Sequence, residues 1–313
     1  MLKSTRPIRA LLASTTVGIA ALTMIGCSGA EPADSTDGKI VAVAAENTYG
    51  DVLAQIGGSH VEVHSIMTNP NTDPHSFEAN TSVAKQVSQA RLLIQNGLGY
   101  DDFMTKIEKA NPSPNRKIIN AQQVRGLPDN TPNPHLWYDP ETMPAVADAI
   151  AQALGELVPA AKAEFEQKAV TFKASLQPWR DALAAFAQAH PGTPVAVTEP
   201  VADYLLKAGG VNIRTPWSLE AAVMNDTDPA ATDLEFQNSL ITGKQVKALI
   251  YNQQVNDNST KALLDKATAA AVPVVAVYET MPEGFSYQDW MLAEVKALSA
   301  AVTGGTSTES LSR

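Results

Sequence analysis

The chain has 313 residues, a formal net charge of −10 and a single cysteine. This length suits two α/β lobes of ordinary size. The negative charge argues against nucleic acid or an anionic lipid surface as a partner, and a single cysteine excludes an intramolecular disulfide.

Residues 1–26 are predicted to be a secretory signal peptide. Basic residues precede an apolar run that ends just before Cys27, which is the order of such a signal, and the run is short for a membrane span. The small residue before Cys27 resembles a bacterial lipobox, which implies a lipid on the Cys27 thiol; the alternative is a buried free thiol. Residues 27–38 are small, polar and contain proline, so they predict a lipidated flexible tether.

Residues 39–157 alternate between strand and helix patterns. Short apolar runs separated by helical segments predict βαβ units and a mostly parallel sheet, and therefore an N-terminal α/β lobe. The predicted strands are residues 39–46, 61–67, 91–97 and 117–121, and the main helices between them are 47–58, 82–90 and 100–110.

Residues 158–191 have almost no strand signal and predict one long helix that spans between two lobes. Pro159 suits the first helical position. Pro178 lacks an N–H group and is expected to kink this helix. His190 ends it, where a partly charged imidazole suits the helix dipole.

Residues 192–303 return to alternation and predict a C-terminal α/β lobe, followed by a frayed tail over 304–313. The fold class expected is therefore α/β, with two Rossmann-like lobes, each a mostly parallel sheet flanked by helices, joined by one long spanning helix. The strands expected in this lobe are 194–199, 211–215, 246–252 and 272–279.

Polar side chains follow several of these strands. In an open α/β sheet, ligands bind beyond the carboxyl ends of the strands, and this places His75, His135, Glu199 and Glu279 at candidate positions. Two neutral imidazoles and two carboxylates carry a charge of about −2, which a divalent cation neutralises. Each residue alone also fits a turn, a helix cap or a salt bridge, but the four together favour a metal site.

Two further histidines, His60 and His64, flank Glu62 within a predicted strand. A period of two places side chains on one face, so the three are a second chelating candidate. The interpretation favoured here is a solvated face of an edge strand.

The motifs around the four candidate ligands resemble those of the zinc/manganese solute-binding lipoproteins of ABC importers. The stretches concerned are NPNTDPHSFE, NPHLWYDP, VAVTEPVADYLL and VVAVYETMPEGFSYQDWM, and the similarity runs from Lys39 to about Val302. It implies His75, His135, Glu199 and Glu279 as ligands and two similar lobes joined by one long helix. The chain departs from the zinc branch in having no acidic, histidine-rich loop after the first motif, and Glu199 where a third histidine is common.

The resemblance implies an extracytoplasmic protein, lipid-anchored through Cys27 to the outer face of a bacterial membrane, that delivers a metal to an ABC permease. The expected ligand is Mn²⁺ or Zn²⁺, with ferrous iron as a third candidate, because an oxygen-rich set suits manganese while intrinsic affinity rises toward zinc. We expect a monomer that binds no nucleic acid. Asp139, Asn252 and Gln253 lie near strand exits and are predicted to orient the ligands.

Two other functions are weighed against this one. A siderophore- or chelate-binding protein of the same architecture would need an aromatic or basic cleft, and aromatic residues are only 6% of the chain. A secreted zinc hydrolase would need an open metal position and a general base, and no H-E-x-x-H motif is present. The sequence therefore favours a binding protein over an enzyme.

Overall fold

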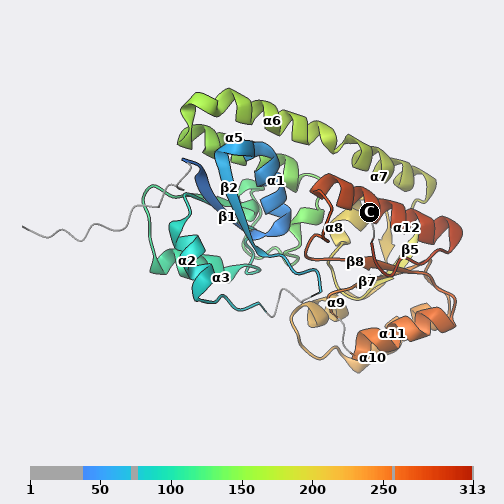
Figure 1. The fold of residues 1–313 in the computed structure, drawn as a ribbon. Coiled ribbons are helices and arrows are strands. Elements are labelled where there is room, and N and C mark those ends of the chain that lie inside the picture. Colours follow the sequence, from blue (N-terminus) through green and yellow to red (C-terminus); the bar gives the residue numbers. More distant parts are fainter. Residues whose placement is uncertain (1–37, 72–76, 256–257, 312–313) are drawn as a thin grey trace, which may run out of the picture. The chain divides into compact units, whose positions relative to one another are not determined.

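Two four-stranded parallel sheets form the framework of the protein (Figure 1). The computed structural model describes residues 38–71, 77–255 and 258–311. The first sheet has the order β2-β1-β3-β4 and the second β6-β5-β7-β8, with every pairing parallel, as the alternating sequence predicts. The strands are β1 Ile40–Glu46, β2 Val61–Met67, β3 Leu92–Gln95, β4 Lys117–Asn120, β5 Pro194–Val197, β6 Asn212–Ile213, β7 Leu249–Asn252 and β8 Val274–Val277.

Both faces of the first sheet are buried, which explains why its central strands, β1 and β3, are apolar up to their last residues, Glu46 and Gln95. Alternate residues of a strand point to opposite faces, and the sequence of β1 shows the consequence. Val43 and Ala45 pack in a cluster with Val87 and Met104, which lie on α2 (Thr81–Gln89) and α3 (Asp102–Ala110). The other face of the sheet packs on α1 (Asn47–Gly57) and α5 (Thr142–Leu157), with the short α4 (Ala121–Val124) after β4.

The predicted spanning helix is two helices placed end to end. The first, α6 (Lys162–Ser175), packs on α5 and α1, whereas α7 (Gln177–Ala189) packs on α12 of the second lobe (Figure 1). Leu176 separates them, and Pro178 lies in the first turn of α7. Because proline has no N–H group to donate to the preceding turn, the regular ladder of hydrogen bonds is interrupted there.

The helices of the second lobe are α8 Asp203–Ala208, α9 Trp217–Met224, α10 Ala231–Thr242, α11 Asn258–Ala269 and α12 Tyr287–Gly304. The tail that follows α12 differs from the frayed end that the sequence predicts. Thr308 pairs in parallel with Val275 of β8, so the chain continues along the edge of the second sheet. No helix in the described part of the chain is long and apolar enough to cross a membrane.

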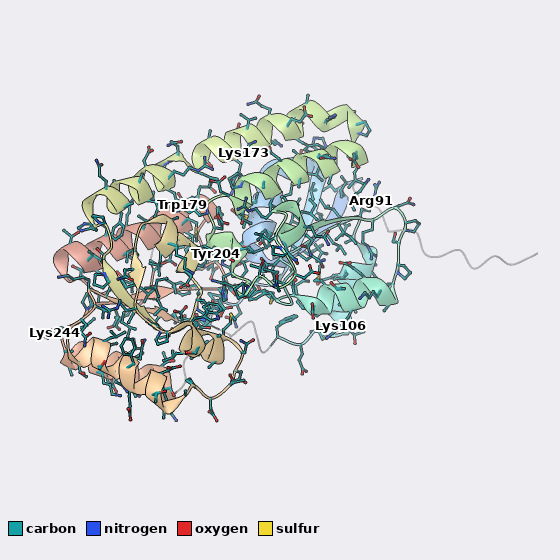
Figure 2. The ribbon with its side chains drawn as sticks, turned by 180° about the vertical axis from the view of Figure 1, so that it is seen from behind. Arg91, Lys106, Lys173, Trp179, Tyr204 and Lys244 are labelled. Carbon is teal, nitrogen blue, oxygen red and sulfur yellow. The ribbon has the colours of Figure 1, made fainter. Side chains whose placement is uncertain are left out.

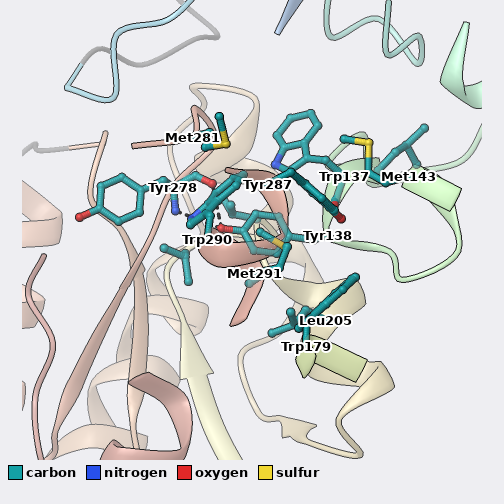
Figure 3. Packing of buried hydrophobic residues seen from close by; sticks show 14 of the residues in the cluster. Trp137, Tyr138, Met143, Trp179, Leu205, Tyr278, Met281, Tyr287, Trp290 and Met291 are labelled. Atoms are coloured by element: carbon teal, nitrogen blue, oxygen red, sulfur yellow. Dashed lines mark hydrogen bonds between the residues drawn. The ribbon is translucent and has the colours of Figure 1, made fainter. Parts of the chain in front are cut away.

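One hydrophobic cluster contains residues from both lobes. Figure 3 shows Trp137 and Tyr138, which follow the first sheet, packed among Tyr278, Tyr287 and Trp290 of the second lobe. Hydrogen bonds cross the same region: the Tyr138 hydroxyl donates to the carbonyl of Tyr278 over 2.9 Å, and the Tyr287 hydroxyl donates to the carbonyl of Trp137 over 2.7 Å. The two lobes therefore share a core beside the carboxyl ends of their strands.

Polar side chains of α1 extend this contact between the lobes. Asn47 makes a reciprocal pair of hydrogen bonds with the backbone of Met281, one of 2.8 Å from its amide nitrogen and one of 3.0 Å to its amide oxygen. Asp51 accepts from the backbone N–H of Tyr287 over 2.9 Å. We call these contacts, together with those of Tyr138 and Tyr287, the lobe seam.

Candidate metal site

His135 lies on the loop between α4 and α5, directly before a 3₁₀ turn formed by residues 136–138, and its side chain is completely buried. The amide oxygen of Asn133 accepts two hydrogen bonds from it, one from the backbone N–H (3.0 Å) and one from ring Nδ1 (2.8 Å). A backbone N–H group only donates, so the facing atom of Asn133 is its oxygen. Nδ1 of His135 therefore carries a hydrogen, and the lone pair of the neutral ring is on Nε2.

Glu279 comes from the second lobe, two residues after β8, and faces that lone pair. Its Oε2 atom lies 3.1 Å from Nε2 of His135, and both side chains have no exposed surface. A carboxylate oxygen and an imidazole lone pair are both acceptors, so they tolerate this distance only with a proton or a metal cation between them. One side chain of this pair comes from each lobe, and the two share a proton or a bound cation.

The carboxylate of Glu279 is oriented from two sides. The side-chain amide of Asn252, at the end of β7, donates to Oε1 over 2.7 Å, and the hydroxyl of Tyr100, from the first lobe, donates to Oε2 over 2.9 Å. Tyr100 also packs edge-on against the ring of His135. Asn252, predicted from the sequence to orient a ligand, thus lies in direct contact with the candidate ligand Glu279.

Gln254 forms hydrogen bonds with the backbone of Glu279 and of Thr280. Its amide oxygen accepts from the backbone N–H groups of Glu279 (2.7 Å) and Thr280 (2.8 Å), and its own N–H donates to Asn252. The sequence prediction named Gln253, whose backbone N–H donates to the carbonyl of Val277. Gln253 and Gln254 both lie in the turn directly after β7, so no local pattern in the sequence separates them.

Glu199 follows β5 and is buried, with 3% of its surface exposed. It lines a cavity of about 610 Å³ with residues of α9, α10 and α11. The carbonyl of the next residue, Pro200, accepts a 2.7 Å hydrogen bond from the side-chain amide of Asn133. Tyr204, labelled in Figure 2, donates to the backbone carbonyl of Asn133 over 2.8 Å. Asn133 therefore connects the loop of His135 to the segment that carries Glu199.

Asp139 was predicted to orient a ligand, but the contacts found for its side chain are with Arg125 and with the backbone of Glu141. One carboxylate oxygen pairs with the guanidinium of Arg125 at 3.0 Å, and the other accepts from the backbone N–H of Glu141 at the start of α5. These contacts hold the end of the loop that follows His135.

The loop after β3 supports the His135 loop and was not identified from the sequence. The side-chain amide of Asn96 donates to the carbonyl of Pro134 over 2.8 Å. Asp101 in turn accepts from the backbone N–H groups of Asn96 and Gly97. Gly97 has a φ of +88°, and a Cβ atom there would lie 2.8 Å from the side chain of Asn120, so only glycine fits this turn.

Two buried acids lie behind this loop. Burial raises the pKa of Asp101 to about 6, against the lowering effect of its backbone hydrogen bonds. Burial, with the nearby Asp101 carboxyl, raises the pKa of Glu46 well above its ordinary range. A group with a raised pKa holds its proton more firmly, so these two carboxyls bring less negative charge to the interior than their number suggests.

The remaining predicted positions are placed as follows. His75 and Cys27 lie outside the described residues. His60 pairs with Glu164 of α6 at 3.1 Å, whereas His64 pairs with Glu62 at 3.2 Å, so these histidines do not converge on one point. Within the residues that the structure describes, no group of three or more His, Cys, Asp or Glu side chains is arranged to hold a metal; the predicted set is represented there by the His135–Glu279 pair and Glu199.

Comparison with known proteins finds similarity to metal-binding components of metal-uptake systems. The family model described as zinc-uptake complex component A, periplasmic, matches residues 42–301. The manganese-binding lipoprotein MntA of Bacillus subtilis is 25% identical over 262 residues, covering 79% of this chain and 82% of that protein. The manganese ABC transporter substrate-binding lipoprotein PsaA of Streptococcus pneumoniae is 25% identical over 292 residues, covering 86% and 90%.

Among solved structures, the periplasmic zinc-binding protein TroA of Treponema pallidum has the same fold. It superimposes with a TM-score of 0.70 at 18% sequence identity, covering 86% of this chain and all of that one. The family match extends over both sheets and over the loops that carry His135, Glu199 and Glu279. The chain belongs to the zinc-uptake complex component A family of periplasmic proteins.

Proposed function

We propose that this protein captures a divalent transition metal ion between its two lobes and delivers it to the permease of an ABC importer. The observation that carries the proposal is the buried contact between Nε2 of His135 and Oε2 of Glu279, 3.1 Å apart. Each lobe contributes one atom with a lone pair, and a cation between them removes their repulsion and neutralises the carboxylate. Four protein ligands would leave no open position on the metal for substrate chemistry, which supports a binding protein rather than an enzyme.

The proposed ligands are His75, His135, Glu199 and Glu279. Glu199 is buried and is connected to His135 through Asn133 and Pro200. The orientation of His135 by Asn133, and of Glu279 by Asn252 and Tyr100, is the support that metal ligands need to keep their tautomer and position.

Manganese is the proposed cargo, with zinc as the competing ion. Two carboxylates supply up to four oxygen atoms, and oxygen-rich sets suit manganese, although zinc binds most sites of this type tightly. The substitution Glu199→His replaces a carboxylate with an imidazole. We expect it to shift the preference of the protein from manganese toward zinc, measured by competition of the two ions and native mass spectrometry. An unchanged preference would remove Glu199 from the ligand set.

Metal binding itself is tested on mature protein stripped with a chelator and reloaded with Mn²⁺, Fe²⁺ or Zn²⁺. Elemental analysis is expected to find one bound metal ion per wild-type chain and none in a His135→Ala/Glu279→Ala variant. The matched control, His190→Ala/Glu62→Ala, removes the same residue types from positions away from the site and is expected to retain the metal. Stoichiometric metal in the first variant would overturn the proposal.

We also propose that the chain works as a monomer anchored through a lipid on Cys27 at the outer face of the cell membrane. The relatives named above are described as lipoproteins, and the cysteine follows a signal-like segment. Labelling with a fatty acid in cells is expected to mark the wild-type protein and not the Cys27→Ser variant. Equal labelling of both would contradict the anchor.

A further inference from the structure

The C-terminal tail, residues 306–311, runs beside the edge strand β8 and forms one parallel bridge with it, between Thr308 and Val275. Thr308 donates to the carbonyl of Val274, and Ala276 donates to the carbonyl of Thr308, each over 2.8 Å. The hydroxyl of Ser307 accepts from the N–H of Val274 over 3.1 Å. The tail therefore occupies the backbone groups of β8 that would otherwise form the open edge of the sheet.

Beyond this pairing, the tail reaches two tyrosines near the candidate metal site. The hydroxyl of Tyr251 donates to the carbonyl of Glu309 over 2.7 Å, and the N–H of Leu311 donates to the hydroxyl of Tyr278 over 3.1 Å. Leu311 also packs against the main hydrophobic cluster. Both tyrosines are buried, and they lie on β7 and immediately after β8.

Each tyrosine is the chain neighbour of a residue in the site. Tyr251 precedes Asn252, which donates to the carboxylate of Glu279, and Tyr278 precedes Glu279 itself. The tail thus holds, from the outer edge of the sheet, the two chain segments whose side chains meet at Oε1 of Glu279. Neither segment can shift along the sheet without breaking a hydrogen bond to the tail.

We propose that residues 306–311 are a strap that positions Glu279 and so sets the metal affinity of this chain. The inference rests on the proposed function, because it assigns Glu279 as a ligand. The residues of the strap touch no ligand; they act through Tyr251 and Tyr278. Removal of the strap is expected to leave the metal site assembled but looser, which weakens binding by about tenfold to a hundredfold, the range typical of residues that support metal ligands.

The experiment compares the mature protein with four variants, two of which change Thr308. Thr308→Pro removes the N–H group that donates to Val274, whereas Thr308→Val keeps the backbone and serves as its matched control, since no hydrogen bond of the Thr308 side chain is found in the described residues. Tyr278→Phe removes only the hydroxyl that accepts from Leu311. Val87→Ala, in the first lobe, controls for a general loss of stability.

Two quantities are measured: manganese affinity, and amide hydrogen exchange at Glu279 and Thr280, whose N–H groups bond to Gln254. We expect exchange at both amides to accelerate in Thr308→Pro and Tyr278→Phe, with affinity reduced, while Thr308→Val and Val87→Ala keep the wild-type values. Unchanged exchange at Glu279 in Thr308→Pro would overturn the strap, and so would faster exchange with unchanged affinity.

The two readouts separate this inference from the proposed function. If the wild-type protein binds no metal, the proposed function is wrong, and with it the role of the strap in affinity. Exchange at Glu279 in the variants then still decides whether the tail holds that segment. If the wild-type protein binds metal and the variants behave like it in both measurements, only the strap is wrong.

Discussion

The side-chain amide of Asn133 donates a 2.7 Å hydrogen bond to the carbonyl of Pro200, and so one residue of the first lobe is joined to the segment of Glu199 in the second. The same side chain accepts from Nδ1 of His135. Asn133 therefore sets the tautomer of one proposed ligand and the position of the segment that carries another.

Replacement of Asn133 by alanine is expected to reduce metal affinity by about tenfold to a hundredfold, because the His135 ring loses the acceptor that fixes its orientation. Asn133→Asp keeps an acceptor for Nδ1 but loses the donor to Pro200, so it is expected to retain more of the affinity. Titration calorimetry with Mn²⁺ measures both. Equal losses in the two variants would mean that the bond to Pro200, rather than the orientation of the ring, is what matters.

Gln254 is expected to matter more than Gln253. Gln254→Ala leaves the buried N–H groups of Glu279 and Thr280 without their acceptor, at a cost of about 1–3 kcal/mol in unfolding free energy for each unpaired group. Metal affinity is expected to fall as well, since the backbone of Glu279 is released. Gln253→Ala is the matched control and is expected to bind metal like the wild type. Denaturant unfolding and metal titration of both variants test this, and a larger effect at Gln253 would contradict the assignment.

Removing a contact of the lobe seam is expected to lower the stability of the protein. Asn47→Ala removes two hydrogen bonds to the backbone of Met281 that join residues 234 positions apart in the chain. The unfolding free energy is expected to fall by about 1–3 kcal/mol, because the N–H and carbonyl of Met281 lose partners in a partly buried place. Asn111→Ala is the control: its side chain donates to the carbonyl of Ile107 at an exposed helix end, and it is expected to change stability little in urea denaturation. Equal effects of the two substitutions would argue against a stabilising seam.

Glu294 predicts a dependence of stability on pH. Burial raises its pKa to about 8 from an ordinary value of 4.5, although hydrogen bonds with Trp290 and Tyr138 lower it. Since the folded pKa is the higher one, the stabilising contribution is fully present below pH 4.5 and is lost as the pH rises toward 8. Glu294→Gln cannot titrate, so its melting temperature is expected to fall less between about pH 5 and about pH 8 than that of the wild type. The melting temperatures of both proteins are measured by calorimetry across this pH range. An equal fall of the melting temperature in the two proteins would show that Glu294 does not titrate in this way.

Much of the fold could be predicted from the sequence because the signals are local. Apolar runs such as 40–46 are bounded by turn residues, and their alternation with amphipathic segments specifies parallel sheets before any contact is known. The same rule, that ligands gather beyond the carboxyl ends of strands, selected His135, Glu199 and Glu279. Two of these lie in direct contact in the structure although 144 positions separate them.

Other residues of the site could not be predicted, because no pattern in the sequence around them indicates their role. The roles of Asn133, Gln254 and Tyr100 depend on which backbone or carboxylate each side chain meets in a distant segment. Likewise, the tail after α12 has the composition of a frayed end, and only the open edge of β8 beside it provides the partners that order it.

The sequence by itself determined the class of the fold, the order of its elements and the residues that face the junction of the lobes, because these follow from the periodicity of apolar residues and from strand ends. The tertiary structure alone decided how the candidate ligands are held and what the tail does. Those outcomes depend on hydrogen bonds between segments far apart in the chain, and a buried donor or acceptor takes whichever partner the packing of the lobes brings to it.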